Sequence, residues 1–316
     1  MKKQVIIGML LLLVACKATN PSHTAGSDIS SAQKPTISFT FDDGNTADMP
    51  GYTLEVWNAL LLKSLQKHNL KAILFSSGAN KTDQKGKYVL QSWNDAGHWI
   101  ANHTFTHPNF NSNKTTLENF EWELMMNDSI IKTYSNYLPL FRFPYLKEGN
   151  TAEKVNGFRL FMKEKGYRNG YVTIDASDWY VDSRLRERLK QNTKANVEAF
   201  KTFYLEHLYD RAQYYESLSY QLTNRHINHT ILLHHNLAAA LFLDDLIQYF
   251  KDKGWNVMDA EKAYADAIYQ KQPTNIPAGE SLIWALAKES GKFESILRYP
   301  AEDSEYEKDK MDKLGL

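Results

Sequence analysis

The chain has very little cysteine, since Cys16 is the only one among its 316 residues. A single cysteine excludes an internal disulfide, so burial and packing must hold the fold together. An excess of one charge sign is also missing, because Lys+Arg and Asp+Glu both number 37 and the formal net charge at pH 7 is zero. No overall field would draw such a protein to nucleic acid or to anionic lipid, and we expect a neutral partner.

A hydrophobic run long enough to cross a membrane is absent as well. The apolar run from Val5 to Ala15 falls short of the roughly 20 residues that a span needs. Because it follows Lys2 and Lys3, it is typical of the apolar core of a secretory signal. It ends in Leu-Val-Ala-Cys, which resembles the lipobox of bacterial lipoproteins. We therefore predict a signal peptide at residues 1–15 and a lipid on Cys16; the alternative is an ordinary signal peptide cut at a small residue nearby.

A lipid on Cys16 would tether the protein to a membrane of the bacterial cell envelope without spanning it. Residues 16–34 are rich in Ala, Thr, Ser, Gly and Lys and lack periodicity, so they predict a flexible tether. The folded domain is predicted at residues 35–260, and residues 261–316 are predicted to form a C-terminal extension packed on it. One α/β domain accounts for this length, and no internal repeat is found.

Short apolar runs alternate with helical patterns along the domain. Strands are predicted at residues 37–41, 72–75, 99–102, 140–143, 171–174 and 230–234, and helices at residues 54–65, 116–134, 152–165, 184–221 and 238–253. A Thr-Thr-Leu-Glu capping box at residues 115–118 is expected to open the second of these helices. In the extension, we expect a helix at 261–270, an apolar segment at 281–287 and a solvated charged helix at 302–313. Such alternation predicts parallel strands with crossover helices, in a barrel or in an open doubly wound sheet.

Candidate site residues recur where the predicted strands end. They are Asp42 and Asp43 at the end of the first strand, His103 after the third, Arg142 and Pro144 at the end of the fourth, Asp175 and Asp178 after the fifth, and His234 at the end of the last. In a parallel α/β barrel the carboxyl ends of the strands share one face. We therefore expect these residues to converge there.

Four residues suggest a metal site. His103 and His107 offer two imidazoles, and Asp42 and Asp43 offer one carboxylate as a ligand and a second one beside it. A divalent metal with three protein ligands keeps a position for water, whose pKa falls to roughly 7. Taken singly, each group has an ordinary explanation, because Asp-Asp-Gly often forms only a turn and His-x-x-x-His is often not a ligand pair. Their occurrence in order at strand ends favours a hydrolytic site.

The ordered set resembles the NodB-type polysaccharide deacetylases, carbohydrate esterase family four. The resemblance is carried by Thr40-Phe41-Asp42-Asp43-Gly44, by His103-Thr104-Phe105-Thr106-His107-Pro108, by Arg142-Phe143-Pro144-Tyr145, by Asp175-Ala176-Ser177-Asp178-Trp179 and by Leu232-Leu233-His234. It covers about residues 36 to 260. It implies a distorted (β/α)7-type barrel and the hydrolysis of acetyl groups from an N-acetylated glycan, chitin-like or of peptidoglycan type, with a bound metal that is usually zinc.

The resemblance also implies roles for single residues. Asp43, His103 and His107 would hold the metal, and Asp42 would act as the general base. Arg142 would pair with Asp42 and keep it ionised by lowering its pKa.

The remaining roles concern the oxyanion and the leaving amine. The backbone N–H of Tyr145 would help to stabilise the oxyanion. His234 would be the general acid, oriented and kept protonated by Asp178. His235 is an alternative, but adjacent strand residues face opposite sides, so only one of the two can enter the site. The sequence departs from the resemblance at Leu146, where many members have glycine.

Two further functions stay open at this stage. The same fold can serve a small-molecule amidase or an O-acetyl esterase, and a non-catalytic lipoprotein could retain the fold to bind sugar. The second is disfavoured, because Asp42, Arg142, Asp178 and His234 are not needed to hold a metal and all four are present.

Overall fold

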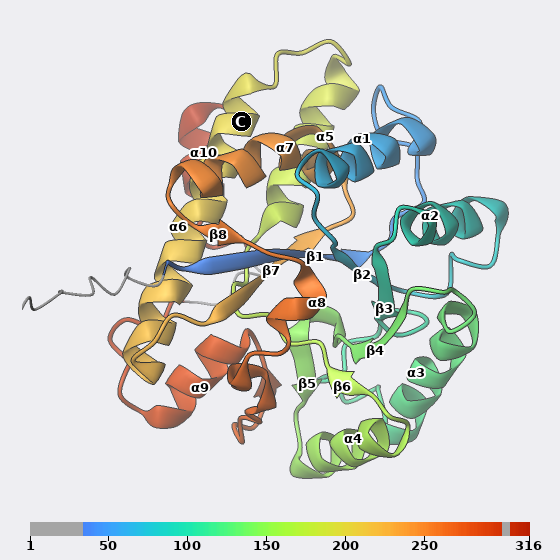
Figure 1. Ribbon diagram of the computed structural model, residues 1–316, viewed down its shortest axis with the longest axis vertical. Helices are drawn as coiled ribbons and strands as arrows, with labels where there is room; N and C mark the ends of the chain where they lie inside the picture. The colour runs from blue at the N-terminus through green and yellow to red at the C-terminus, as the bar shows by residue number, and fades with distance from the viewer. Residues whose placement is uncertain (1–33, 299–303) are drawn as a thin grey trace, which may run out of the picture. The chain divides into compact units, whose positions relative to one another are not determined.

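The computed structural model describes residues 34–298 and 304–316 (Figure 1). The predicted signal peptide, the lipid on Cys16 and the tether up to residue 33 lie outside these residues. Within the described residues, no helix is both long enough and apolar enough to cross a membrane.

A curved sheet of parallel strands forms the centre of the domain (Figure 1). Its strands are β1 (Thr36–Asp43), β2 (Ile73–Ser76), β3 (Trp99–Asn102), β4 (Tyr137–Phe141), β6 (Arg168–Asn169), β7 (Asn228–His234) and β8 (Asn256–Val257). They are ordered β6-β4-β3-β2-β1-β7, and β8 also pairs with β1. A separate antiparallel pair joins β5 (Lys147–Gly149) to β9 (Ala278–Gly279). The predicted barrel-like α/β fold is confirmed.

The register of the sheet brings the carboxyl ends of its strands to one edge. Asp43 lies opposite Ser76 of β2, and Ser76 lies opposite Asn102 of β3. On the other side of β1, Asp42 lies opposite His234 of β7. The polar residues that follow these strands therefore start from neighbouring positions, as expected for parallel strands.

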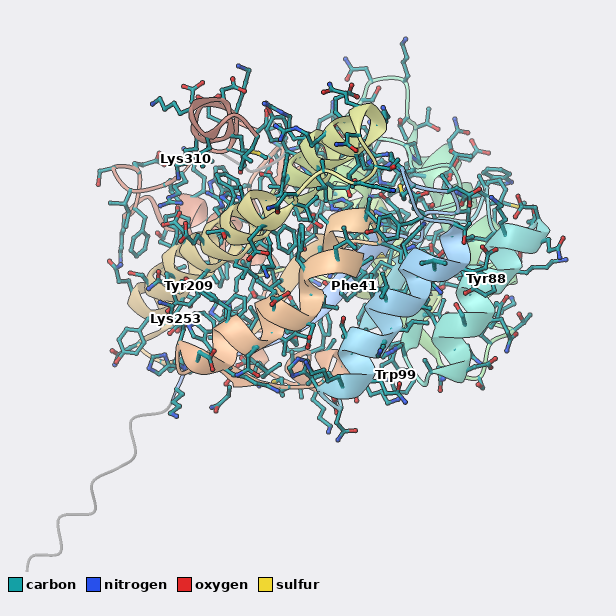
Figure 2. All side chains as sticks on the ribbon, turned by 90° about the horizontal axis from the view of Figure 1, so that it is seen from above. Phe41, Tyr88, Trp99, Tyr209, Lys253 and Lys310 are labelled. Atoms are coloured by element: carbon teal, nitrogen blue, oxygen red, sulfur yellow. The ribbon has the colours of Figure 1, made fainter. Side chains whose placement is uncertain are left out.

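Helices cover the sheet. They are α1 (Leu54–Lys67), α2 (Gln84–Asp95), α3 (Leu117–Ile131), α4 (Ala152–Glu164), α5 (Asp178–Gln191), α6 (Glu198–Thr223), α7 (Leu237–Asp252), α8 (Ala260–Ala263), α9 (Leu282–Ser290) and α10 (Lys308–Leu314), with short 3-10 turns η1 (Pro144–Leu146) and η2 (Ala267–Gln270). Seen from above, α7 lies between α1 and α6, and it contacts both (Figure 2). Their apolar sides meet the sheet in a core that contains Trp57, Leu61, Leu243 and Phe250.

The predicted strand at residues 171–174 is wrong. Gly170 N donates to Phe141 O of β4 at 2.7 Å, whereas Ile174 N donates to Thr230 O of β7 at 3.0 Å. The chain therefore crosses from one edge of the sheet to the other and leaves only an isolated bridge between Ile174 and Ile231. This crossing segment gives the open sheet its barrel-like closure.

The helix predicted at 184–221 is two helices, α5 and α6. Asn192 Oδ1 accepts from Lys194 N at 3.0 Å and Asn196 Oδ1 accepts from Glu198 N at 2.9 Å. Asparagine side chains that bond the nearby backbone in this way favour turns over a continuous helix. Helix α2 was not predicted.

The predicted capping box is displaced by one residue. The N-cap of α3 is Thr116, whose side chain accepts from Asn119 N at 3.1 Å. Thr115 and Glu118 therefore do not make the reciprocal pair that the pattern suggested.

The extension is more deeply packed than its charge pattern suggested. The predicted helix at 261–270 is replaced by the short α8 and η2, and the charged segment forms α10. Helix α10 is not simply solvated, because Met311 is fully buried in the main core and Asp312 pairs with Arg184 of α5 at 2.7 Å. A methionine within a charged run thus anchors the end of the described chain.

We expect Met311→Ala to destabilise the protein by roughly 2–5 kcal/mol, because it removes a buried side chain and leaves a cavity. Urea unfolding followed by circular dichroism would measure the change. Leu314→Ala is the matched control, since Leu314 lies in the same helix and is 63% exposed. Equal losses of stability in the two variants would contradict the burial of α10.

Candidate active site

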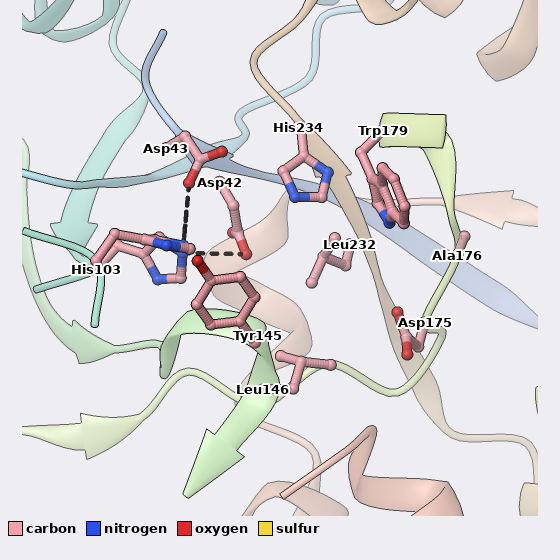
Figure 3. A pocket seen from close by; sticks show the side chains of 11 residues that line it. Asp42, Asp43, His103, Tyr145, Leu146, Asp175, Ala176, Trp179, Leu232 and His234 are labelled. Atoms are coloured by element: carbon pink, nitrogen blue, oxygen red, sulfur yellow. Dashed lines mark ion pairs between the residues drawn. The ribbon is translucent and has the colours of Figure 1, made fainter. Parts of the chain in front are cut away.

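A cavity of about 300 Å³ opens at the carboxyl ends of the strands (Figure 3). Its lining residues come from strand ends and from the loops that follow them: Asp42, Asp43, His103, His107, Tyr145, Leu146, Asp175, Ala176, Trp179, Leu232 and His234. Of the residues predicted for the site, Arg142 and Asp178 do not line the cavity but bind residues that do. The structure thus brings all the predicted site residues into one region.

Asp43, His103 and His107 have the spacing of a metal site. One ligand atom from each lies within 4.8 Å of the others. Asp43 Oδ1 is 3.7 Å from His103 Nε2 and 3.4 Å from His107 Nε2. Ligands held at about 2.0–2.1 Å in a tetrahedral site would lie roughly 3.4 Å apart, so the three residues fit a divalent ion such as zinc.

The two imidazoles are prepared to act as ligands. Burial lowers the pKa of both His103 and His107 to about 4, so each ring is neutral near pH 7 and keeps a lone pair. His103 Nδ1 lies 2.8 Å from the backbone oxygen of Arg142. Donation to that oxygen places the remaining lone pair on Nε2, which faces Asp43.

Asp42 is buried beside the three candidate ligands and bonded to Arg142. Arg142 Nη1 donates to Asp42 Oδ1 at 2.7 Å. Burial raises the pKa of Asp42, and the opposing effect of Arg142 does not cancel it. Arg142 lowers this pKa, as expected, but the loss of hydration raises it by more, so the net pKa of Asp42 lies above its usual value.

Arg142 is held by groups that no motif predicted. Its Nε donates to Gly170 O at 2.9 Å, and its Nη2 donates to the Tyr264 hydroxyl at 3.1 Å. Its guanidinium carbon also lies 3.8 Å from the ring centroid of Phe75. Gly170 belongs to the crossing segment and Tyr264 to the predicted extension, so their contribution follows from the tertiary fold alone.

His234 faces the cavity with Asp178 behind it. His234 Nδ1 lies 2.6 Å from Asp178 Oδ1, and His234 N donates to Asp178 Oδ2 at 2.9 Å. Asn236 Nδ2 donates to the same Oδ2 at 3.0 Å. Although burial lowers the pKa of His234, the charge and hydrogen bond of Asp178 outweigh it and raise that pKa to about 10. The imidazole is therefore protonated near neutral pH.

His235 points away from the cavity, as neighbouring residues at a strand end should. Its Nε2 lies 2.9 Å from Asn58 Oδ1, and its ring centroid lies 4.3 Å from that of Trp57 in the core. His234, the histidine that the motif position indicated, is therefore the one that faces the cavity.

Left-handed backbone is concentrated at the site. Of the nine non-glycine residues with positive φ in the described chain, five lie in or beside the cavity: Asp43, Thr104, His107, Tyr145 and Leu146. Each such conformation costs on the order of 1–3 kcal/mol and persists only where the surroundings enforce it. Tyr145 lies in η1, is 48% exposed and has its ring 4.6 Å from that of His107.

Glu123 of α3 is a supporting residue that no sequence motif indicated. Its Oε2 accepts from Phe105 N at 2.8 Å and from Thr106 N at 2.5 Å, and its Oε1 accepts from the Thr106 hydroxyl. These bonds fix the loop between His103 and His107.

Part of the chain is similar to known deacetylases of glycans. A family model described as "Polysaccharide deacetylase" matches residues 30–168. This stretch contains Asp42, Asp43, His103, His107 and Arg142, and it ends before Asp178 and His234.

Two curated proteins, both peptidoglycan-N-acetylglucosamine deacetylases of Bacillus cereus, are similar to part of the chain. One is 26% identical over 147 residues, which cover 46% of this chain and 47% of the relative. The other is 31% identical over 162 residues, which cover 50% of this chain and 52% of the relative. The chain therefore spans about half the length of the curated relatives that it matches.

A solved structure shares the fold. The catalytic domain of the peptidoglycan N-acetylglucosamine deacetylase from Eubacterium rectale is 17% identical, with a TM-score of 0.50. The similarity covers 78% of this chain and 92% of that chain.

The spacing of the three candidate ligands generates a prediction about metal binding. We expect Asp43→Asn and His107→Ala to weaken zinc binding by at least about 10–100-fold. Replacing a residue that only contacts a metal ligand already costs this much, and these two residues are candidate ligands themselves. Zinc content after dialysis, with competition against a chelating dye, would measure it.

Asp42→Asn is the matched control and should keep zinc, although Asp42 Oδ2 lies 3.8 Å from His103 Nε2. Full zinc retention in His107→Ala would contradict the three-residue site. Loss of zinc in Asp42→Asn would make Asp42 a ligand.

Proposed function

We propose that this chain, whose residues 30–168 match the polysaccharide deacetylase family model, is a metal-dependent deacetylase of an N-acetylated glycan. The substrate we propose is a glycan of peptidoglycan or chitin type in the bacterial cell envelope, and the relatives named above support this choice. With Cys16 as a lipid anchor, the enzyme would work at a membrane surface.

One observation carries the proposal. The cavity brings together three residues that could hold a metal, with a carboxylate beside them and an imidazole whose pKa is raised to about 10. A non-catalytic sugar-binding protein would not need Asp42 aimed by Arg142, nor His234 aimed by Asp178. Base and acid on separate residues suit hydrolysis of an amide, whose amine leaves only when protonated.

Asp43, His103 and His107 would hold the divalent metal, with zinc as the expected ion. When bound, the metal supplies a Lewis acid that polarises the acetyl carbonyl and lowers the pKa of an attacking water.

Asp42 is the proposed general base. It lies beside the metal site, and the hydrogen bond from Arg142 fixes the direction of its carboxylate. As the water attacks the acetyl carbon, Asp42 takes one of its protons. The developing oxyanion would accept from the backbone N–H of Tyr145, a residue of η1 that lines the cavity.

His234 is the proposed general acid. Asp178 is fully buried, and its carboxylate binds both Nδ1 and the backbone N–H of His234. Nε2 is left to face the cavity and to protonate the amine nitrogen as the carbon–nitrogen bond breaks. The products are acetate and the free amine of the sugar.

Asp42→Asn should lower the rate of acetate release by about 10²–10⁴-fold, since it removes the base and keeps a similar shape. The assay would use the protein without its signal peptide on N-acetylglucosamine oligomers, peptidoglycan fragments and O-acetylated sugars. Chelator should abolish the activity, and Asp95→Asn in α2 should leave it unchanged. No acetate release from any substrate by the zinc-loaded protein would favour the sugar-binding alternative, whereas release from O-acetyl sugars alone would favour an esterase.

The two histidines at the end of β7 provide a second test. We expect His234→Gln to lose about 10²–10⁴-fold in kcat, because the general acid is removed. His235→Gln should keep most of its activity if it folds, since its ring lies in the core. Equal losses in two variants with native circular dichroism spectra would overturn the assignment of the acid.

A further inference from the structure

Leu146 has an unusual backbone for a buried leucine. It lines the cavity, is 7% exposed and packs against Val172 and Leu232. Its φ of 55° lies in the left-handed region, which bulky side chains rarely adopt. Such an outlier at a cavity wall points to a role for the position of this side chain.

The extension holds Leu146 in this conformation. Strand β9 pairs with β5, which begins at the next residue, and Glu280 N donates to Leu146 O at 2.9 Å. Gly279 packs so closely that an added Cβ would lie 2.1 Å from Leu146 O. Leu282 N donates to Val172 O at 2.8 Å, so the same segment also fixes the neighbour of Leu146. The extension therefore forms a support behind this wall of the cavity.

The cavity has two chemically different ends (Figure 3). One end carries the candidate metal ligands with Asp42 and His234. The other is walled by Leu146, Leu232, Trp179 and Ala176, with Asp175 as its polar member.

These ends dictate how an N-acyl sugar can lie. Its carbonyl carbon must sit between Asp42 and His234 for water attack and amine protonation to occur. The sugar is polar and continues into a chain, so it must leave through the open mouth. The acyl group is the apolar substituent and therefore fits the apolar end.

We infer that Leu146, supported by β9 and Glu280, sets the length of the acyl group that the enzyme accepts and restricts it to acetyl. This inference rests on the proposed function and adds a determinant of substrate choice. One extra methylene against a packed apolar wall typically costs about 10–200-fold in kcat/KM. Removing the Leu146 side chain should open space for it.

The experiment compares N-acetyl, N-propionyl and N-butyryl glucosamine oligomers, with release of the free amine as the readout. In the wild-type protein, propionyl substrate should react at least about tenfold more slowly than acetyl. Leu146→Ala and Leu146→Gly should each raise the propionyl-to-acetyl ratio of kcat/KM by about tenfold or more. Leu160→Ala is the control, because Leu160 is an exposed leucine of α4 outside the cavity.

The two variants separate side-chain size from backbone strain. Both enlarge the cavity, but only glycine adopts a φ of 55° without steric cost. If Leu146→Ala fails to fold, Leu146→Gly carries the test. A changed ratio in the glycine variant alone, with the alanine variant folded, would assign selectivity to backbone strain and overturn the inference.

A second measurement keeps this test separate from the proposed function. Calorimetry would measure the affinity of the zinc-loaded protein for acetate, propionate and butyrate. These affinities depend on the space beside Leu146 and need no catalysis. Affinity should fall with chain length in the wild type and fall less in both Leu146 variants. Wild-type protein that binds or cleaves the butyryl compound as well as the acetyl one overturns the inference. A carboxylate series that responds to Leu146 without any amine release would reject the deacetylase function, while upholding Leu146 as the residue that limits the chain length the cavity binds.

Discussion

The buried ion pair of Arg142 and Asp42 is the interaction on which the candidate site depends. Taking two charges out of water is costly, and their attraction offsets this only when the remaining polar atoms are bonded. Arg142 meets that condition through Thr40 of β1, Gly170 of the crossing segment and Tyr264 of the extension. These bonds come from three separate parts of the chain. The pair therefore contributes orientation to Asp42 more than it contributes net stability.

A second constraint is the strained backbone around the candidate ligands. His107 and Leu146 both have positive φ, and each is enforced by a different neighbour. On the His107 side, Glu123 fixes the preceding loop through the backbone of Phe105 and Thr106. On the Leu146 side, β9 fixes the carbonyl. Each loop is thus fixed by its own neighbour, which suits groups that must meet a small reacting centre.

Much of the site could be predicted because parallel strands end at one edge. That rule alone gathers Asp42, Asp43, His103 and His234, which are far apart in the chain, and it needs no side-chain detail. Supporting residues such as Tyr264 could not be predicted, since a single tyrosine carries no motif and its role comes from packing. The failed strand at 171–174 has a similar cause. Its residues have strand propensity, but they cross between two strands instead of pairing along one.

The family model matches only part of the sequence that forms the cavity. The stretch that matches the family model supplies the candidate metal site and the base, whereas Asp178 and His234 lie beyond it. The extension is farther along still, yet its residue Glu280 bonds the carbonyl of Leu146 at the apolar end. Similarity to the relatives therefore bears most directly on metal-assisted chemistry. The size of the acyl group depends on contacts between Leu146 and the extension, which lies outside the matched residues. It therefore depends on packing that the match does not cover.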